Sequence, residues 1–255
     1  MLPIGDDNSD RTITPIVNYI LIAANVLVFV LFQQFGANDR FTYAWATVPR
    51  EIVTGRDVTT PPHVIEGPVG QQLEEPGLQP TPGSVYLTLL TSMFMHGSIM
   101  HIFGNMLFLW IFGDNLEDRM GHVRYLIFYL VCGVLASLAH VFSTVMLGQN
   151  QLVPSLGASG AISGVLGGYV LLFPKRQVRV ILFRFLTTVP AYVALGLWFA
   201  FQLISSVGML GGGTEAGGVA YAAHVGGFIA GLVLVKLFDR GPSARPTAPQ
   251  WFGRG

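Results

Sequence analysis

Six apolar segments constrain the fold of this chain more than any other feature of its sequence. A helix that spans a lipid bilayer needs about 20 predominantly apolar residues. Of the 255 residues only 11% are charged, whereas soluble domains carry about 25%. We therefore predict an all-α, polytopic membrane protein with six transmembrane helices, of which the fourth is the shortest. The six segments are 14–35, 99–116, 125–146, 158–173, 187–209 and 219–237.

The positive charges of the loops predict how these helices are oriented. Loops rich in Lys and Arg stay on the cytoplasmic side of a membrane. This rule predicts a multi-pass protein of the cell membrane, with both termini in the cytoplasm and a long extracytoplasmic first loop at about residues 36–98. The few positive residues on the outer side are Arg40, Arg50 and Arg56. The inner side holds Arg11, Arg119, Arg124, Lys175, Arg176, Arg179, Arg184, Lys236, Arg240, Arg245 and Arg254.

Four polar side chains inside the predicted spans are the candidates for a function, because polar groups there are costly and usually functional. His101 and Asn105 are one helical turn apart in the second span. Ser159 begins the fourth span, and His224 lies near the start of the sixth. In the predicted topology these three helices all run from outside to inside. At a rise of about 1.5 Å per residue, the four groups lie within about 10 Å of the outer surface, so we expect one shared polar pocket.

These four side chains are the groups that acyl transfer requires. An imidazole takes the proton of a serine hydroxyl, and hydrogen-bond donors stabilise the oxyanion that forms. Each residue also has an ordinary role in a membrane bundle. A serine can bond back to its own helix, a histidine can belong to a proton path, and an asparagine can join two helices. The residues alone leave a hydrolase, a transporter and a structural bundle open.

Three short motifs resemble those of the rhomboid intramembrane proteases. Residues 96–105 (HGSIMHIFGN) read H-x4-H-x3-N, residues 157–160 (GASG) read G-x-S-G, and residues 223–227 read AHVGG. The run EDRMG at 117–121 is similar to the family's E-x-R-x-G after its second helix. The order of spans and loops agrees with the family too, so the likeness covers nearly the whole chain.

The resemblance implies a role for each of these residues in a serine-type endopeptidase. Ser159 would be the nucleophile and His224 its general base, while His101 and Asn105 would line the oxyanion hole. Two glycines around the nucleophile would allow a tight entry into the fourth helix, and the first motif histidine would be structural or contact water. The supporting residues are His96, Gly157, Gly160 and Gly227.

The resemblance also implies what the protein acts on and how it is organised. Family members cleave transmembrane segments of other proteins, so transmembrane protein substrates and the lipid bilayer are the expected partners. No metal, ATP or organic cofactor is expected, and a formal net charge of zero favours no nucleic-acid partner. The expected parts are a cytoplasmic N-terminal segment at 1–13, a six-helix rhomboid protease domain at 14–239, and a disordered cytoplasmic tail at 240–255.

The sequence departs from the family pattern in two features. Many members carry a Trp-Arg pair in the first loop where this chain has Leu87 and Thr88, so we expect this loop to be anchored differently. Some members have an aromatic residue four positions after the nucleophile that packs on the base, and here the residue is Ser163. The tyrosines that are candidates to orient the base instead are Tyr86, Tyr169 and Tyr221.

The same residues bear on other possible functions of a membrane protein. A catalytically inactive relative that escorts membrane clients would have lost Ser159 or His224, and this chain retains both. A transporter would usually show internal repeats or charged residues at mid-membrane. A metalloprotease needs H-E-x-x-H, which the sequence lacks. An aspartyl intramembrane protease needs G-x-G-D, and here Ile111 replaces the first glycine before Asp114.

No carboxylate is expected beside the base. The acidic residues of the second span follow His101 by 13 to 17 positions, a distance of about 20 Å or more along a helix. Glu215, in a Gly-rich loop before His224, should reach only the outer mouth of the pocket. The sequence therefore predicts a Ser–His dyad whose imidazole is oriented by packing, a hydroxyl or a backbone carbonyl, and not by an acid as in soluble serine proteases.

Overall fold

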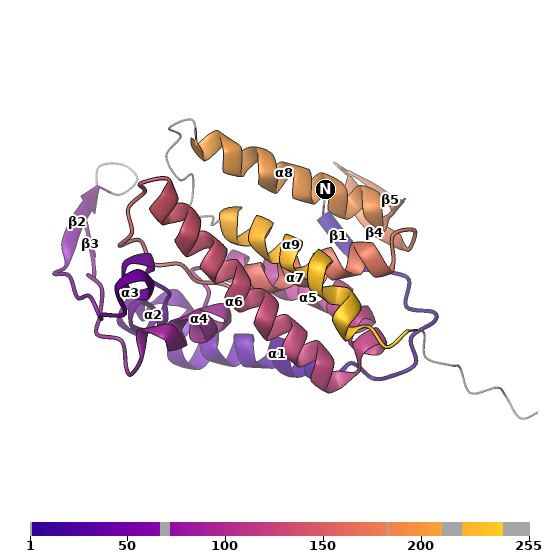
Figure 1. The fold of residues 1–255 in the computed structure, drawn as a ribbon, viewed down its shortest axis with the longest axis horizontal. Coiled ribbons are helices and arrows are strands. Elements are labelled where there is room, and N and C mark those ends of the chain that lie inside the picture. Colours follow the sequence, from indigo (N-terminus) through magenta and orange to yellow (C-terminus); the bar gives the residue numbers. More distant parts are fainter. Residues whose placement is uncertain (1, 67–71, 183, 211–220, 242–255) are drawn as a thin grey trace, which may run out of the picture.

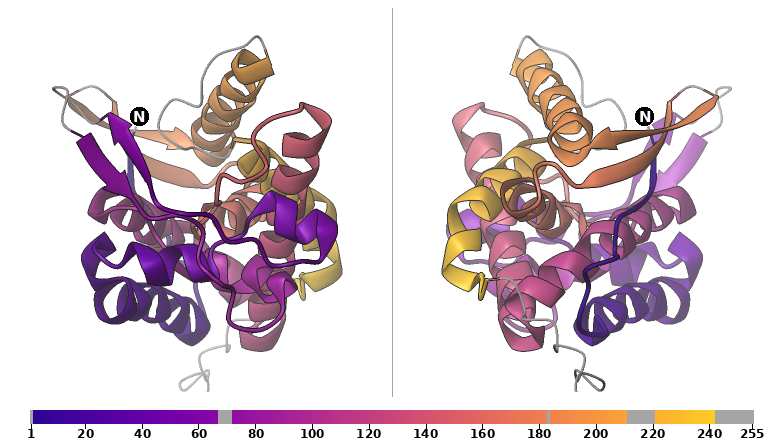
Figure 2. Two further views of the ribbon diagram at one scale, coloured as in Figure 1. Left: turned by 90° about the vertical axis from the view of Figure 1, so that its left-hand side faces the viewer. Right: turned by 90° about the vertical axis from the view of Figure 1, so that its right-hand side faces the viewer.

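The protein is a mostly helical bundle, seen here in a computed structural model (Figure 1). The structure describes residues 2–66, 72–182, 184–210 and 221–241. Each of the six predicted segments contains one principal helix. The bundle consists of α1 (Ile16–Leu27), α5 (Ile99–Met120), α6 (His122–Met146), α7 (Ser159–Leu172), α8 (Ala191–Leu210) and α9 (Tyr221–Phe238). The helices α1 and α8 lie on opposite sides of the bundle (Figures 1 and 2).

Three of these helices, α5, α6 and α9, are long and apolar enough to cross a membrane. The other three contribute shorter apolar stretches, which are Ile16–Phe32, Ser159–Leu172 and, in α8, Ala191–Ile204. α1 continues into the π-helical turn η1 (Val28–Phe32), and α7 has 14 residues. The structure therefore agrees with a polytopic helical protein, while the count of six spans stays a prediction.

Two small antiparallel sheets are present that the all-α prediction lacked. The first contains β1 (Leu2–Asp6), β4 (Gln177–Leu182) and β5 (Phe185–Pro190), in the order β1-β4-β5. Val178 and Val180 of the central strand are fully buried, as expected for alternating β-branched residues with one face on a core. Because residues 187–190 belong to β5, the predicted segment 187–209 begins too early, and the helix starts at Ala191.

The first loop is folded against the end of the bundle at which α7 begins. It contains the helices α2 (Asp39–Trp45), α3 (Pro49–Thr54) and α4 (Thr88–Thr91), the hairpin β2 (His63–Glu66) and β3 (Gln72–Glu75), and the short 3-10 turns η2 (Gln34–Gly36), η4 (Val85–Leu87) and η5 (Ser92–Phe94). Thr47 exchanges two backbone hydrogen bonds with Ser155, at 2.9 and 2.8 Å. Its hydroxyl donates to the Thr88 carbonyl at 2.8 Å. This loop therefore holds the segment that leads into α7 without a Trp-Arg pair.

Close packing through glycines joins α6, α7 and α9. A Cβ atom at Gly227 would lie 2.1 Å from the Gly160 carbonyl oxygen, and one at Gly160 would lie 2.7 Å from the Ala136 Cβ. Small residues let helix backbones approach each other closely in lipid. Here they fix the start of α7 against α9, which are the helices that carry Ser159 and His224.

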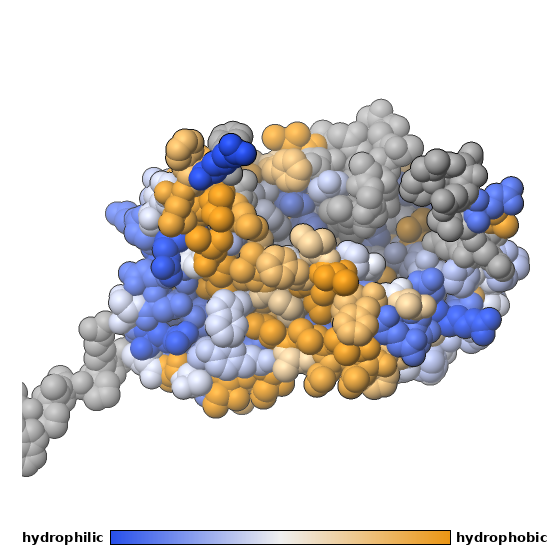
Figure 3. Space-filling model, turned by 180° about the vertical axis from the view of Figure 1, so that it is seen from behind, coloured by the Kyte–Doolittle hydropathy of each residue, from blue (hydrophilic) through white to orange (hydrophobic). Residues whose placement is uncertain are grey.

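Apolar side chains form a band across the surface displayed in Figure 3, and hydrophilic residues gather at both ends of the molecule. Exposed apolar residues of this kind occur on α1, α5 and α8, and they include Ile20, Leu27, Trp110, Leu197 and Ile204. A continuous exposed apolar surface marks a site of contact with lipid or with another protein. Together with the three long apolar helices, the band describes a protein embedded in a bilayer.

The N-terminal strand β1 is fastened to the C-terminal halves of α5 and α7 through Asp6. The Tyr169 hydroxyl of α7 donates a hydrogen bond to the Asp6 carboxylate, and the Asn115 side-chain amide of α5 donates another at 2.8 Å. Burial raises the pKa of Asp6 from 3.8 to about 6, and the nearby charge of Asp114 acts in the same direction. The hydrogen bond from Tyr169 and the charge of Arg176 oppose this shift of the pKa.

We expect Asp6 to make the protein less stable as the pH rises through about 6. A carboxyl whose pKa is raised by folding favours the folded state below its unfolded pKa of 3.8 and loses that contribution as it ionises. Between about pH 5 and pH 7.5 the loss is about 1 kcal/mol. Asp6→Asn keeps an acceptor for Tyr169. In detergent, the thermal unfolding midpoint of this variant should depend less on pH than that of the wild type.

Asp7→Asn is the matched control, because Asp7 is the exposed next residue and backbone and side-chain hydrogen bonds from Ser9 lower its pKa. In this variant the thermal unfolding midpoint should change between pH 5 and pH 7.5 as it does in the wild type. Parallel curves for the wild type and Asp6→Asn would show that Asp6 is not the titrating group.

Candidate active site

Ser159 is the first residue of α7, at the point where the chain enters the bundle. Gly157 has φ +125, a conformation that favours glycine, and its N–H donates to the Ser92 carbonyl at 2.9 Å. The N-cap residue Ala158 has no side chain that caps the helix. The first backbone N–H groups of α7 therefore have no side-chain acceptor from the cap, and the positive end of the helix dipole lies at Ser159.

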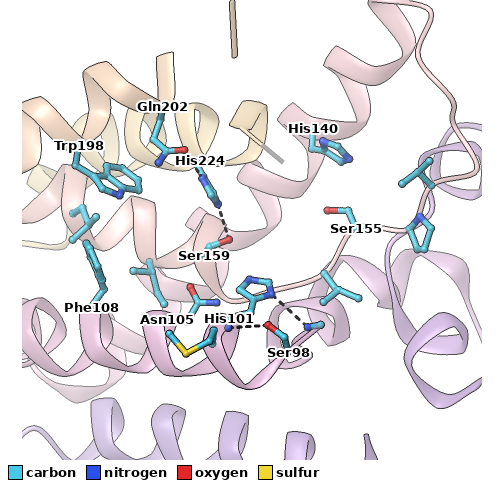
Figure 4. Close-up of a pocket in the computed structure, with 18 residues that line it drawn as sticks. Ser98, His101, Asn105, Phe108, His140, Ser155, Ser159, Trp198, Gln202 and His224 are labelled. Carbon is cyan, nitrogen blue, oxygen red and sulfur yellow. Dashed lines mark hydrogen bonds between the residues drawn. The ribbon is translucent and has the colours of Figure 1, made fainter. Parts of the chain in front are cut away.

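His224 lies on α9 and faces Ser159 across the cavity (Figure 4). Its Nε2 atom is 2.7 Å from the Ser159 Oγ atom, which is hydrogen-bond distance. The two residues are 65 positions apart in the sequence, and the glycine contacts between α7 and α9 bring them together. This pair has the geometry of a nucleophile and its general base.

His101 and Asn105 of α5 lie on the other side of Ser159 (Figure 4). The Asn105 side chain is buried, and its Nδ2 donor has no hydrogen-bond partner among the described residues. The His101 Nδ1 atom accepts a long hydrogen bond, 3.4 Å, from the Gly97 N–H. A Cβ atom at Gly157 would lie 2.9 Å from the His101 ring, so this glycine lets the imidazole approach the start of α7.

One cavity of about 700 Å³ joins the four predicted polar residues. It lies between α5, α6, α7, α8 and α9 and the segment before α7, and apolar side chains make up part of its wall. Ser159, His224, His101 and Asn105 all line it. The structure thus brings together the four side chains that the sequence places at one depth.

His96 lies just outside this cavity and is fully buried. The Gln33 side chain holds its backbone, accepting from the His96 N–H at 2.9 Å and donating to its carbonyl at 3.0 Å. The imidazole meets the His101 ring edge-on, with centroids 5.0 Å apart. Neither ring nitrogen of His96 has a hydrogen-bond partner among the described residues. The expectation of a structural or water-contacting residue stays a prediction.

The aromatic neighbours of His224 are Trp198 and Tyr221. The Trp198 ring of α8 has its centroid 6.0 Å away with a 35° tilt, and the Tyr221 ring meets the imidazole edge-on at 6.5 Å. Ser163 stands where some family members have an aromatic residue, and its hydroxyl donates a hydrogen bond to the Ser159 carbonyl at 2.6 Å. Of the tyrosines proposed from sequence, Tyr169 instead contacts Asp6 and Tyr86 lies beside Gly55, so those two candidates were wrong.

The residues of this cavity that sequence reasoning missed include Trp198, Gln202 and His140. The Gln202 Oε1 atom of α8 is 2.8 Å from the His224 Nδ1 atom. The available signal was a lone amide within the apolar segment 187–209, because polar residues inside spans are functional candidates. No Asp or Glu is among the described residues that line the cavity, and Glu215 lies outside the described residues.

The described residues contain no group of three or more His, Cys, Asp or Glu side chains that is arranged to hold a metal ion. His101, His140 and His224 line the cavity, but they do not form such a cluster. The expectation that the protein needs no metal stays a prediction.

Comparison with known proteins identifies the relatives of the chain. The model of the Rhomboid domain matches residues 83–240. Rhomboid protein 1, mitochondrial, of Saccharomyces cerevisiae is 33% identical over 171 residues, which cover 65% of this chain and 47% of that protein. Rhomboid protease GluP of Bacillus subtilis is 37% identical over 142 residues, which cover 54% of this chain and 26% of that protein. Rhomboid-like protein 11, chloroplastic, of Arabidopsis thaliana is 33% identical over 162 residues, which cover 61% of this chain and 53% of that protein. The chain thus spans about half or less of the length of these relatives.

Proposed function

The chain belongs to the rhomboid family, and on that basis we propose that it is an intramembrane serine endopeptidase. Its reaction would be hydrolysis of peptide bonds in or near transmembrane segments of other membrane proteins. The observation that carries this proposal is the 2.7 Å contact between the His224 Nε2 and Ser159 Oγ atoms inside a cavity of a membrane-embedded bundle. One of the relatives is named a rhomboid protease.

The proposed chemistry follows from these two side chains. The Ser159 Oγ atom attacks the carbonyl carbon of the substrate peptide while His224 Nε2 takes its proton. The tetrahedral intermediate then collapses, the C–N bond breaks, and His224 gives the proton to the leaving amine. In the second half of the reaction water attacks the acyl-enzyme and gives a proton to His224, which returns it to the Ser159 Oγ atom as the acyl C–O bond breaks and the acid product leaves.

Two side chains and the start of α7 are arranged to stabilise the oxyanion. The buried Asn105 Nδ2 atom has no partner among the described residues, so it is a donor ready for a ligand oxygen. The Gly97 N–H donates to His101 Nδ1, which favours the tautomer with a hydrogen on Nε2. The N-terminal N–H groups of α7 and its dipole add positive potential. Such preorganised donors lower the energy of the transition state because they need no rearrangement.

The substrates of this proposal are transmembrane proteins that approach through the bilayer. The cavity lies within a bundle whose outer surface carries exposed apolar side chains, and its own wall includes Met100, Phe108, Ile162 and Leu166. An apolar peptide segment matches such a wall, while the polar residues align its scissile bond. We propose residues 14–239 as the protease domain, between an N-terminal segment at 1–13 and a tail at 240–255.

The proposal is tested by reconstituting the purified protein in liposomes with a panel of single-span model substrates. We expect a cut in or next to the span of at least one substrate, mapped by mass spectrometry of the two fragments. Cleavage confined to loops far from any span, or no cleavage across the whole panel, would contradict an intramembrane endopeptidase.

We also propose that the chain lies in the cell membrane with the first loop outside and both termini in the cytoplasm. The distribution of Lys and Arg supports this orientation. A membrane-impermeant maleimide added to intact cells should label Ser84→Cys, in the exposed first loop, but not Gln177→Cys, in the exposed inner strand. The native Cys132 is buried and gives little background. Labelling of Gln177→Cys alone would show that the protein has the opposite orientation.

A further inference from the structure

We infer that Gln202 is a positioning residue that holds His224 in the tautomer able to accept the Ser159 proton, an inference that rests on the proposed function. The three side chains form a chain of contacts across two helices and the start of a third. The Gln202 Oε1 atom is 2.8 Å from His224 Nδ1, and His224 Nε2 is 2.7 Å from Ser159 Oγ. Figure 4 shows them in this order.

The direction of the Gln202 amide decides which nitrogen of His224 carries the hydrogen. With Oε1 facing the ring, Nδ1 must be the donor, so the neutral ring leaves Nε2 as the acceptor that faces Ser159. With the amide turned around, Nδ1 would be the acceptor and Nε2–H would point at the serine oxygen. Only the first arrangement lets His224 act as a base, and it is the arrangement in the structure.

The same contact becomes stronger when the base is protonated. After His224 has taken the serine proton, both ring nitrogens are donors, and the amide oxygen then accepts from a charged group. Hydrogen bonds to charged groups are worth more than those between neutral groups. The contact therefore favours the transition state over the ground state, which is the condition for faster chemistry.

Packing holds the amide in place. Gln202 is 7% exposed, and a buried amide that loses its partner is costly. Trp198, one helical turn earlier on α8, contacts the same imidazole with its ring. Two side chains of α8 thus contact the ring, and Gln202 does so at the nitrogen opposite the one that faces Ser159.

No carboxylate competes for this role among the described residues that line the cavity. The other titratable groups close to His224 are His101 on α5, His140 on α6, and Tyr221 on its own helix. None of them has a hydrogen bond to His224 Nδ1 in the described part of the chain, whereas Gln202 has one. A neutral amide oxygen thus occupies the place that an aspartate has in a soluble triad.

Three variants separate orientation from packing. Gln202→Met keeps a side chain of similar length and removes the acceptor, and Gln202→Glu keeps an acceptor oxygen. Leu203→Met is the matched control, because Leu203 is the next residue and is 44% exposed. Each variant is compared with the wild type for kcat and KM on a model substrate in liposomes, for labelling of Ser159 by a fluorophosphonate, and for the pH–rate profile.

We expect Gln202→Met to lower kcat about 10- to 100-fold with KM within about twofold, because only the transition state loses stabilisation. Gln202→Glu should keep kcat within about fivefold near neutral pH. Its acid limb should move to higher pH by about one unit, since a carboxylate stabilises the protonated ring and the base works only when neutral. Leu203→Met should match the wild type in all three measurements.

Wild-type kinetics in Gln202→Met, or equal losses in Gln202→Met and Gln202→Glu with an unshifted profile, would overturn the positioning role while cleavage by Ser159 stands. A wild type that neither labels nor cleaves would overturn the proposed function and this inference with it. If Gln202→Met does not fold, Gln202→Glu decides alone, and an unmoved acid limb overturns the inference.

Discussion

Replacing Ser159 by alanine should abolish cleavage of every substrate that the wild type cuts, with turnover falling at least about 10⁴-fold. The Ser159 hydroxyl is the oxygen within hydrogen-bond distance of His224 Nε2, and without it the imidazole has no nucleophile to activate. The measurement is the rate of fragment formation in liposomes with matched amounts of protein. Folding should be unchanged, because the variant removes one oxygen from a half-buried position.

Ser163→Ala is the matched control for this loss. Ser163 lies one turn further along α7 and is fully buried, and its hydroxyl donates to the Ser159 carbonyl and not to the base. We expect this variant to keep activity within about tenfold, since a single neutral hydrogen bond contributes about 1 kcal/mol. Cleavage by Ser159→Ala at the wild-type rate would end the serine-protease proposal, and equal losses in both variants would point to damage of the helix.

Asn105→Ala should slow turnover about 10- to 1000-fold, with a smaller effect on KM. The reason is that the Asn105 Nδ2 donor, which has no partner among the described residues, faces the cavity beside Ser159. A donor kept for the oxyanion is used most in the transition state, so its loss appears in kcat. The measurement is the steady-state kinetics of one model substrate under conditions that saturate the wild type.

Asn105→Asp separates the donor from the volume of the side chain. The aspartate has nearly the same shape but places an acceptor where an oxyanion would form, so it should be at least as impaired as Asn105→Ala. His101→Ala should show a partial loss of similar kind, because it removes a second donor. An Asn105→Asp variant with wild-type turnover would exclude Asn105 from the oxyanion hole.

The helices and the grouping of the polar residues were predictable because both follow from strong, local signals. Apolar length and loop charge indicated where His101, Asn105, Ser159 and His224 would lie along their helices. The structure brings these four residues to one cavity, and the glycine pattern around Gly160 accounts for the close helix contact.

The sheet of β1, β4 and β5 was not predictable in the same way. Its strands are short, and β1 pairs with a hairpin more than 170 residues later, for example Gly5 opposite Arg179. Such pairing depends on the final positions of the helices, which the pattern of a single strand does not contain. The buried Asp6 that fastens the strand to Tyr169 was likewise unremarkable in the sequence.

Gln202 was missed for a related reason. A single amide in an apolar segment signals that some polar partner exists, but not which partner. The contact with His224 depends on how α8 rotates about its axis and packs on α9, and both are tertiary features. The sequence predicted that packing, a hydroxyl or a backbone carbonyl orients the imidazole. It did not predict the side-chain amide that contacts His224 in the structure.

The most direct measurement of the central claim is the site of covalent modification by a fluorophosphonate, located by mass spectrometry of the digested protein. A nucleophile activated by its neighbour reacts with such a probe, whereas an ordinary serine does not. We predict a single adduct on Ser159 that is lost in Ser159→Ala and forms far more slowly in His224→Ala. An adduct on another residue, or no adduct in a preparation that cleaves substrate, would contradict the account.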